Sequence, residues 1–192
     1  MIRWIHEAKI LNQKGFGLIE LLVAIGIITL ITSTILVRQS AFNSTVLLEN
    51  QAWEIATDIR QAQNLAASPQ RRSGDDFRGQ YGISFTANTQ TYTVFHLPDG
   101  STSPVNIGRP FSLDPRFVVS SVSANNPTGT NAITDTAVIR FERPNFDAQF
   151  FNGDSNQVIA DSVTVTIQPR GDAANAREIT VSSTGQITVN RP

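Results

Sequence analysis

The architecture of this chain follows from one segment near its start, Lys14-Gly15-Phe16-Gly17-Leu18-Ile19-Glu20-Leu21-Leu22-Val23-Ala24-Ile25-Gly26-Ile27-Ile28. The apolar run continues through Val37, and about 20 such residues are enough for a helix to cross a bilayer. One carboxylate, Glu20, lies inside the run, where an ionised group costs roughly 2.5 kcal/mol or more near the membrane centre. The segment therefore predicts a membrane-spanning helix in which Glu20 has a role that offsets this cost.

The residues that precede the apolar run are mainly basic. Arg3, Lys9 and Lys14 stand against a single acid, Glu7. Basic residues beside a span favour the cytoplasmic side, so we expect a cytoplasmic N-terminus and a chain that lies mostly outside the cytoplasm. The apolar run is longer than the roughly 7–15 residues of a secretory signal core, and no Ala-x-Ala site follows it. An ordinary cleaved signal peptide is therefore disfavoured.

This junction resembles the signature of type IV prepilins. In that superfamily a membrane peptidase cleaves after the glycine, the new N-terminal phenylalanine is N-methylated, and a carboxylate occupies the fifth mature position. The resemblance implies cleavage between Gly15 and Phe16, N-methylation of Phe16 and an assembly role for Glu20. One departure is Gly17, where threonine is commoner. Residues 1–15 would then be a cytoplasmic leader.

The resemblance also suggests how the charge of Glu20 is balanced. Cleavage would create an ammonium group at Phe16, and charges of opposite sign attract strongly in lipid. Within one helix the two groups form an i,i+4 pair, whereas between staggered helices Glu20 would neutralise Phe16 of the next subunit. The family is thought to use the second arrangement, which would set the axial register of a filament. The simpler alternative is that Glu20 lies near the headgroups and snorkels.

Net charge and cysteine content exclude or disfavour several classes of protein function. Removing the four charged leader residues from 15 basic and 16 acidic side chains leaves 12 and 15, a net charge of about −3. A nucleic-acid-binding domain is first recognised by a basic footprint, so nucleic acid is not an expected partner. The chain has no cysteine, which excludes disulfides and thiolate metal sites. Core packing alone must hold the part that follows the helix.

We expect one helix from Phe16 to about Ser68, because no proline occurs before Pro69. It would be about 80 Å long, with residues 16–40 in the membrane and residues 41–68 as an amphipathic continuation. An apolar stripe at spacings of three and four should pack on the following domain: Leu48, Ala52, Ile55, Ile59, Ala62 and Ala66. Small and hydroxylated residues in the first half would allow close helix contact: Gly26, Thr29, Thr32, Ser33 and Thr34.

From Gln80 onward the apolar period becomes two, which is typical of strands. The expected strands are Gln80–Thr86, Thr91–His96, Arg116–Ser123, Ala137–Glu142, Asp147–Phe151, Ser162–Gln168, Glu178–Ser182 and Gln186–Asn190. Turns are expected at Leu97–Gly100 and, as a tight hairpin, at Thr184-Gly185. Residues 69–79, 101–114 and 123–135 should be loops, and the pair Arg71-Arg72 lies in the first of them. The fold class is therefore α+β, with the helix packed on an antiparallel, sandwich-like domain over residues 69–192.

Pieces of this domain are similar to the GspH/FimT family of minor pseudopilins and minor pilins. They are Tyr81–Phe85, Ile139–Asn145 and Arg177–Val189. Phe146 replaces the glycine of the family's Phe-x-Pro-x-Gly-like turn. The family's T-type members include DNA binders with arginines near the C-terminus, where this chain has only Arg191, and DNA binding relies on neutralising several phosphates. Val37 also stands where major pilins usually have proline.

No pattern in the sequence indicates catalysis or a bound cofactor. His96 is the one histidine after the leader, and no nucleophile elbow accompanies it. Asp75-Asp76 and Asp154-x-Asn156 are acidic loops without EF-hand spacing, so solvated turns are favoured over a calcium site. We expect neither cofactor nor metal, and a protein that is not an enzyme but the substrate of a prepilin peptidase and methyltransferase.

The resemblance implies a minor pseudopilin of the type II secretion pseudopilus, anchored in the bacterial inner membrane with its β domain in the periplasm. Its partners would be the processing enzyme, other pilins or pseudopilins, membrane lipid and secreted protein cargo. Two alternatives stay open: a minor pilin of a type IV pilus, and a membrane-tethered binding module that does not polymerise.

Overall fold

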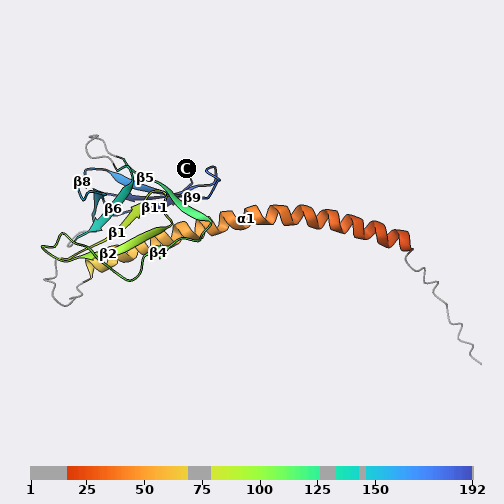
Figure 1. The fold of residues 1–192 in the computed structure, drawn as a ribbon, viewed down its shortest axis with the longest axis horizontal. Coiled ribbons are helices and arrows are strands. Elements are labelled where there is room, and N and C mark those ends of the chain that lie inside the picture. The colour runs from red at the N-terminus through yellow and green to blue at the C-terminus, as the bar shows by residue number, and fades with distance from the viewer. Residues whose placement is uncertain (1–16, 69–78, 126–132, 143–145, 192) are drawn as a thin grey trace, which may run out of the picture. The chain divides into compact units, whose positions relative to one another are not determined.

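A computed structural model describes residues 17–68, 79–125, 133–142 and 146–191, with side-chain environments for all of these except 37–42. In this part of the chain one helix, α1 (Leu18–Ala67), is followed only by strands (Figure 1). Two compact units result, Met1–Phe42 and Asn43–Pro192. The fold is α+β, as expected, and α1 matches the expected helix within two residues at each end. Phe16, its expected first residue, lies outside the described residues.

The second unit contains two antiparallel sheets. Sheet A has the order β3-β2-β1-β6-β7-β8, with β4 also paired to β2. Its strands are β1 (Gln80–Thr86), β2 (Thr91–Leu97), β3 (Val105–Asn106), β4 (Phe111–Ser112), β6 (Thr136–Phe141), β7 (Ala148–Asn152) and β8 (Gln157–Val158). Sheet B has the order β11-β10-β9-β5. Its strands are β5 (Phe117–Asn125), β9 (Ser162–Pro169), β10 (Arg177–Ser182) and β11 (Ile187–Asn190).

Both sheets and the second half of α1 enclose one hydrophobic core. Alternate residues of the central strands are fully buried, including Ile83 and Phe85 on β1 and Val163 and Val165 on β9. Period-two burial is what a strand with one face on a core requires. The predicted helix stripe is confirmed, because all six of its members are buried in this core: Leu48, Ala52, Ile55, Ile59, Ala62 and Ala66.

Polar side chains of α1 hold it to both sheets at defined points. Asp58 accepts a 2.5 Å hydrogen bond from the Tyr92 hydroxyl on β2. Gln51 accepts one of 3.0 Å from the backbone N–H of Asp114. Gln63 donates to two carbonyl oxygens, that of Phe146 at 3.1 Å and that of Gly185 at 3.0 Å. Because hydrogen bonds are directional, these contacts fix the axial position of the helix, which an apolar stripe alone leaves less defined.

The structure contains three short strands that the sequence did not predict, namely β3, β4 and β8. β3 and β4 lie inside residues 101–114, expected to be a loop, and β8 follows β7 where no strand was expected. Each of these strands is only two residues long, which is too short to show the alternation of apolar and polar residues that indicates a strand in a sequence. The tight hairpin expected at Thr184-Gly185 is confirmed: β10 and β11 are antiparallel neighbours, the Gly185 N–H donates to the Ser182 carbonyl at 2.9 Å, and the Ser182 N–H donates to the Gln186 carbonyl at 2.9 Å. The turn expected at Leu97–Gly100 is confirmed, with Gly100 at φ +72°.

Gly185 is required by both conformation and space. Its φ is +81°, and a Cβ there would lie 2.1 Å from the Phe146 carbonyl oxygen and 2.5 Å from Gln63 Nε2. Gly171 has a similar φ of +82°, with nothing within 4 Å of the Cβ position. We expect Gly171→Ala to cost about 1 kcal/mol from backbone strain alone. Gly185→Ala should cost several kcal/mol in the free energy of urea unfolding, because it also displaces Gln63. Equal losses would contradict the close approach.

The Tyr92 hydroxyl should make stability depend on alkaline pH. Burial, the hydrogen bond to Asp58 and the charges of Asp58 and Glu54 raise the pKa of Tyr92 above its ordinary value of 10.0. Above that pH the unfolded chain releases the phenol proton while the folded chain keeps it. The free energy of unfolding must then fall as pH rises. We expect Tyr92→Phe to flatten this fall in urea titrations between about pH 9 and pH 11.

The matched control for this experiment is Tyr81→Phe, which removes the only other tyrosine and leaves the Asp58 contact intact. It should retain the wild-type fall. A wild-type slope in Tyr92→Phe would mean that the phenol is not the titrating group.

Candidate membrane anchor and assembly surface

The first half of α1 presents an apolar surface that the rest of the described chain does not cover. Leu18–Leu36 is long and apolar enough to cross a membrane, and none of it is buried inside the protein. Leu18 and Leu30 are 82% and 71% exposed. Large apolar surfaces of this kind mark contact with a membrane or with another protein. The geometry therefore fits a single-pass membrane anchor, by length and composition.

Glu20 lies in the first turn of α1, and its side chain is exposed. The Glu20 and Leu21 N–H groups donate to the Gly17 carbonyl at 3.0 and 3.1 Å, which closes the first turn. Negative charge at a helix N-terminus is favoured by the helix dipole. Among the described residues no side chain pairs with this carboxylate. Gly15 and Phe16, the expected cleavage residues, lie outside the described residues, so their expected roles stay predictions.

Three hydroxyl groups of the anchor donate within the helix. Thr29 donates to the Ile25 carbonyl at 2.8 Å, Ser33 to Thr29 at 2.8 Å, and Thr34 to Leu30 at 3.0 Å. Such bonds to the carbonyl four residues earlier satisfy the polar hydrogen without another helix. These three residues therefore need no interhelical partner, and the close helix contact expected from the anchor stays a prediction.

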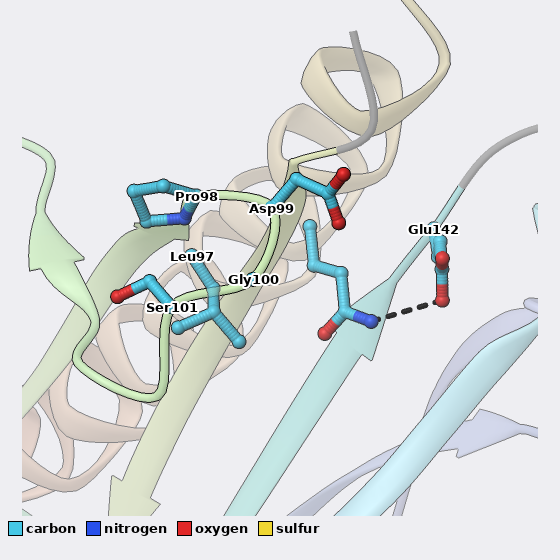
Figure 2. A pocket seen from close by; sticks show the side chains of 7 residues that line it. Leu97, Pro98, Asp99, Gly100, Ser101 and Glu142 are labelled. Carbon is cyan, nitrogen blue, oxygen red and sulfur yellow. Dashed lines mark hydrogen bonds between the residues drawn. The ribbon is translucent and has the colours of Figure 1, made fainter. Parts of the chain in front are cut away.

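Figure 2 shows a polar hollow in the described β domain. It has a volume of about 90 Å³ and is lined by Leu97–Ser101, Gln80 and Glu142. Gln80 donates a 2.9 Å hydrogen bond to Glu142, and Gln149 reaches the same carboxylate oxygen at 3.4 Å. Asp99 lies across the hollow on an exposed turn. Within the described ranges no three His, Cys, Asp or Glu side chains gather to hold a metal.

The other residues considered for chemistry lie apart from one another. His96 is 5% exposed, and its ring centroid is 4.7 Å from that of Tyr81. In the Asp154 loop, Asn152 Oδ1 accepts the N–H groups of Asp154 and Asn156 at 3.1 and 2.9 Å, which is an Asx-type turn. Arg71-Arg72 and Asp75-Asp76 lie outside the described residues.

Two arginines that the sequence analysis did not single out acquire unusual environments. Arg177 on β10 is 4% exposed; its Nη1 donates to the Ala176 carbonyl at 2.7 Å, and Nη2 lies 3.8 Å from Glu49 on α1. Arg140 on β6 is half-buried and stacks on Phe151. The sequence places Arg140 inside a predicted strand and Arg177 just before one. Only the folded structure shows which residues surround their charges.

The anchor coincides with a match to a known family. Residues 10–36 match the family described as the prokaryotic N-terminal methylation motif. The match spans Gly15, Phe16 and Glu20 and ends at Leu36, where the candidate span also ends. No curated protein and no solved structure matches the chain. The chain thus has a type IV prepilin-like N-terminus, which supports a pilin-like or pseudopilin-like role without distinguishing the two.

A charge in the middle of the anchor should prevent stable membrane association. Ile27 lies at the centre of Leu18–Leu36 and is exposed. We expect Ile27→Arg to lose about 2.5–3.5 kcal/mol of insertion free energy and to shift the protein into the soluble fraction after carbonate extraction. Thr57→Arg, on an exposed position of α1 outside the anchor, is the control and should remain in the membrane. Equal extraction of both variants would show that Leu18–Leu36 does not span.

Proposed function

We propose that this protein is a minor pseudopilin, a structural subunit of the type II secretion pseudopilus that acts in protein export across the outer membrane. The observation that carries the proposal is the methylation motif at residues 10–36 on an apolar helix that the described chain leaves uncovered. The GspH/FimT-like pieces of the β domain narrow the proposal to a minor subunit.

In this proposal a prepilin peptidase cleaves between Gly15 and Phe16 and Phe16 is N-methylated. Residues 16–40 then hold the protein in the inner membrane, with residues 1–15 originally in the cytoplasm and the β domain in the periplasm. Glu20 pairs with the new ammonium group of a neighbouring subunit, because both charges are costly in lipid when alone. The β domain contacts other minor subunits and secreted cargo. Its action is architectural, and the protein is a substrate of the processing enzyme rather than an enzyme.

A minor pilin of a type IV pilus is the second candidate, because the matched motif is common to both kinds of filament subunit. The pseudopilus is preferred over a DNA-uptake pilin since Arg191 is the only basic residue in the segment Gly185–Pro192. A DNA receptor needs several cationic side chains acting together. Val37, in place of the proline usual in major pilins, favours a minor subunit in either system.

Charge reversal at Glu20 tests assembly. We expect Glu20→Lys to be inserted and processed normally, as judged by mass spectrometry of a methylated Phe16 N-terminus. Its incorporation into sheared filaments should fall at least about tenfold, because like charges would meet in lipid. Glu54→Lys makes the same charge change on an exposed part of α1 outside the anchor and should assemble normally.

The outcomes separate the alternatives. Normal incorporation of Glu20→Lys would favour a tethered module that does not polymerise. A native chain that still begins at Met1 would refute prepilin processing altogether. Deleting the gene should abolish export of secreted proteins while leaving pili intact; loss of pili with intact export would instead identify a minor pilin.

A further inference from the structure

The outward side of sheet A carries an isolated positive charge. On β6 the residues alternate, with Ala137, Ile139 and Phe141 fully buried while Val138 and Arg140 point to the opposite side. In the sheet register Arg140 lies between Gly82 on β1 and Gln149 on β7. We call this side, around Arg140, the outer face of sheet A. It is the face that the core does not use.

The guanidinium of Arg140 is held in place, and its Nε lacks an acceptor among the described residues. Its central carbon lies 3.9 Å from the ring centroid of Phe151, which is a close cation–π arrangement. Its Nε is buried without a hydrogen-bond partner. On the β1 side, the position of a Gly82 side chain is occupied by the ring of Phe95. Aromatic neighbours therefore remove water from the charge, and this desolvation lowers the pKa of Arg140.

The nearest acid along the strand does not neutralise this charge. Glu142 lies two residues from Arg140, but its carboxylate accepts hydrogen bonds from Gln80 and Gln149. No salt bridge joins Arg140 to any described carboxylate. Partly desolvated charges are normally paired, because an uncompensated one costs free energy. Since no described residue supplies the counter-charge, the stacked guanidinium can accept one from another protein.

We propose that Arg140, supported by Phe151, is a docking site for the carboxylate of an acidic residue on another protein. A guanidinium presents parallel N–H groups that match the two oxygens of a carboxylate. Apolar neighbours complete the site. Val138 lies opposite Phe151 in the sheet register. Ile159, the residue after β8, is 69% exposed.

The surroundings favour a protein carboxylate over a nucleic acid. On the strands around Arg140, no other described outward position carries a lysine or arginine. A single cation neutralises one phosphate, whereas nucleic-acid binding relies on several. Glu142 would also repel a polyanion that lay along the face. The matching partner is a segment with an acidic residue beside an apolar one. This site does not depend on whether the protein enters a filament.

Two peptides that differ in one group test the proposal. The uniformly ¹⁵N-labelled full chain in a neutral maltoside detergent is titrated with acetyl-Ala-Leu-Asp-Phe-Ala-amide or its Asn counterpart, and arginine Nε–H resonances are followed by NMR. The resonance that disappears in Arg140→Lys identifies Arg140. We expect the Asp peptide to shift this resonance saturably and the Asn peptide to bind about tenfold more weakly, because a hydrogen bond to an ionised acceptor is stronger.

Variants distinguish specific binding at Arg140 from nonspecific peptide binding. Arg140→Lys should lose preference for the Asp peptide, since lysine has neither the planar fork nor the stack on Phe151. Phe151→Leu should weaken binding about threefold, and the exposed Arg109→Lys should leave it unchanged. An unshifted Trp53 indole resonance reports that each variant is folded. Equal affinity for both peptides, no binding, or stronger shifts with orthophosphate or a short DNA duplex at equal ionic strength would overturn the proposal.

Discussion

Burial of one stripe of α1 in the core shared by two sheets is the contact on which this structure depends. With no cysteine in the chain, no disulfide can substitute for that packing. Apolar burial supplies the driving force but little directional information. The direction comes from polar contacts, above all from Gln63, which bridges the Phe146 and Gly185 carbonyls and so joins α1 to turns of both sheets. Because Gly185 has no side chain, the Gln63 amide can approach its backbone closely.

The two halves of α1 meet opposite physical requirements. The anchor needs an apolar surface without internal partners, and Leu18–Leu36 has one. The β domain instead needs a helix face whose axial position is fixed by specific contacts. Three hydroxyl groups in the anchor donate to helix carbonyls, so these groups add polarity without requiring another helix. Glu20 differs from these hydroxyl groups, because its carboxylate has no partner among the described residues. The free-energy cost of an ionised carboxylate in lipid is the reason that the assembly proposal rests on this residue.

Sequence periodicity predicted the main elements because their side chains face a single core. β1 was predicted with its observed bounds, and β9 and β10 to within one residue. The two-residue strands were not predictable, since pairing with a longer neighbour, rather than an apolar pattern, creates them. β4 forms where Phe111 stacks on Tyr92 at 5.3 Å, a contact between residues that no local pattern links.

The sequence alone was enough to determine the anchor, the methylation motif and the buried stripe, because each is a linear pattern read along one helix. The motif is borne out by the family match at residues 10–36. Tertiary structure alone decided which charges are left without partners. Arg140 looks like any outward residue of a strand until the register places Gly82 and Phe151 beside it and Gln80 and Gln149 on Glu142. Charge pairing is a property of neighbours in space, and strand order, which sets those neighbours, is not written in any single segment.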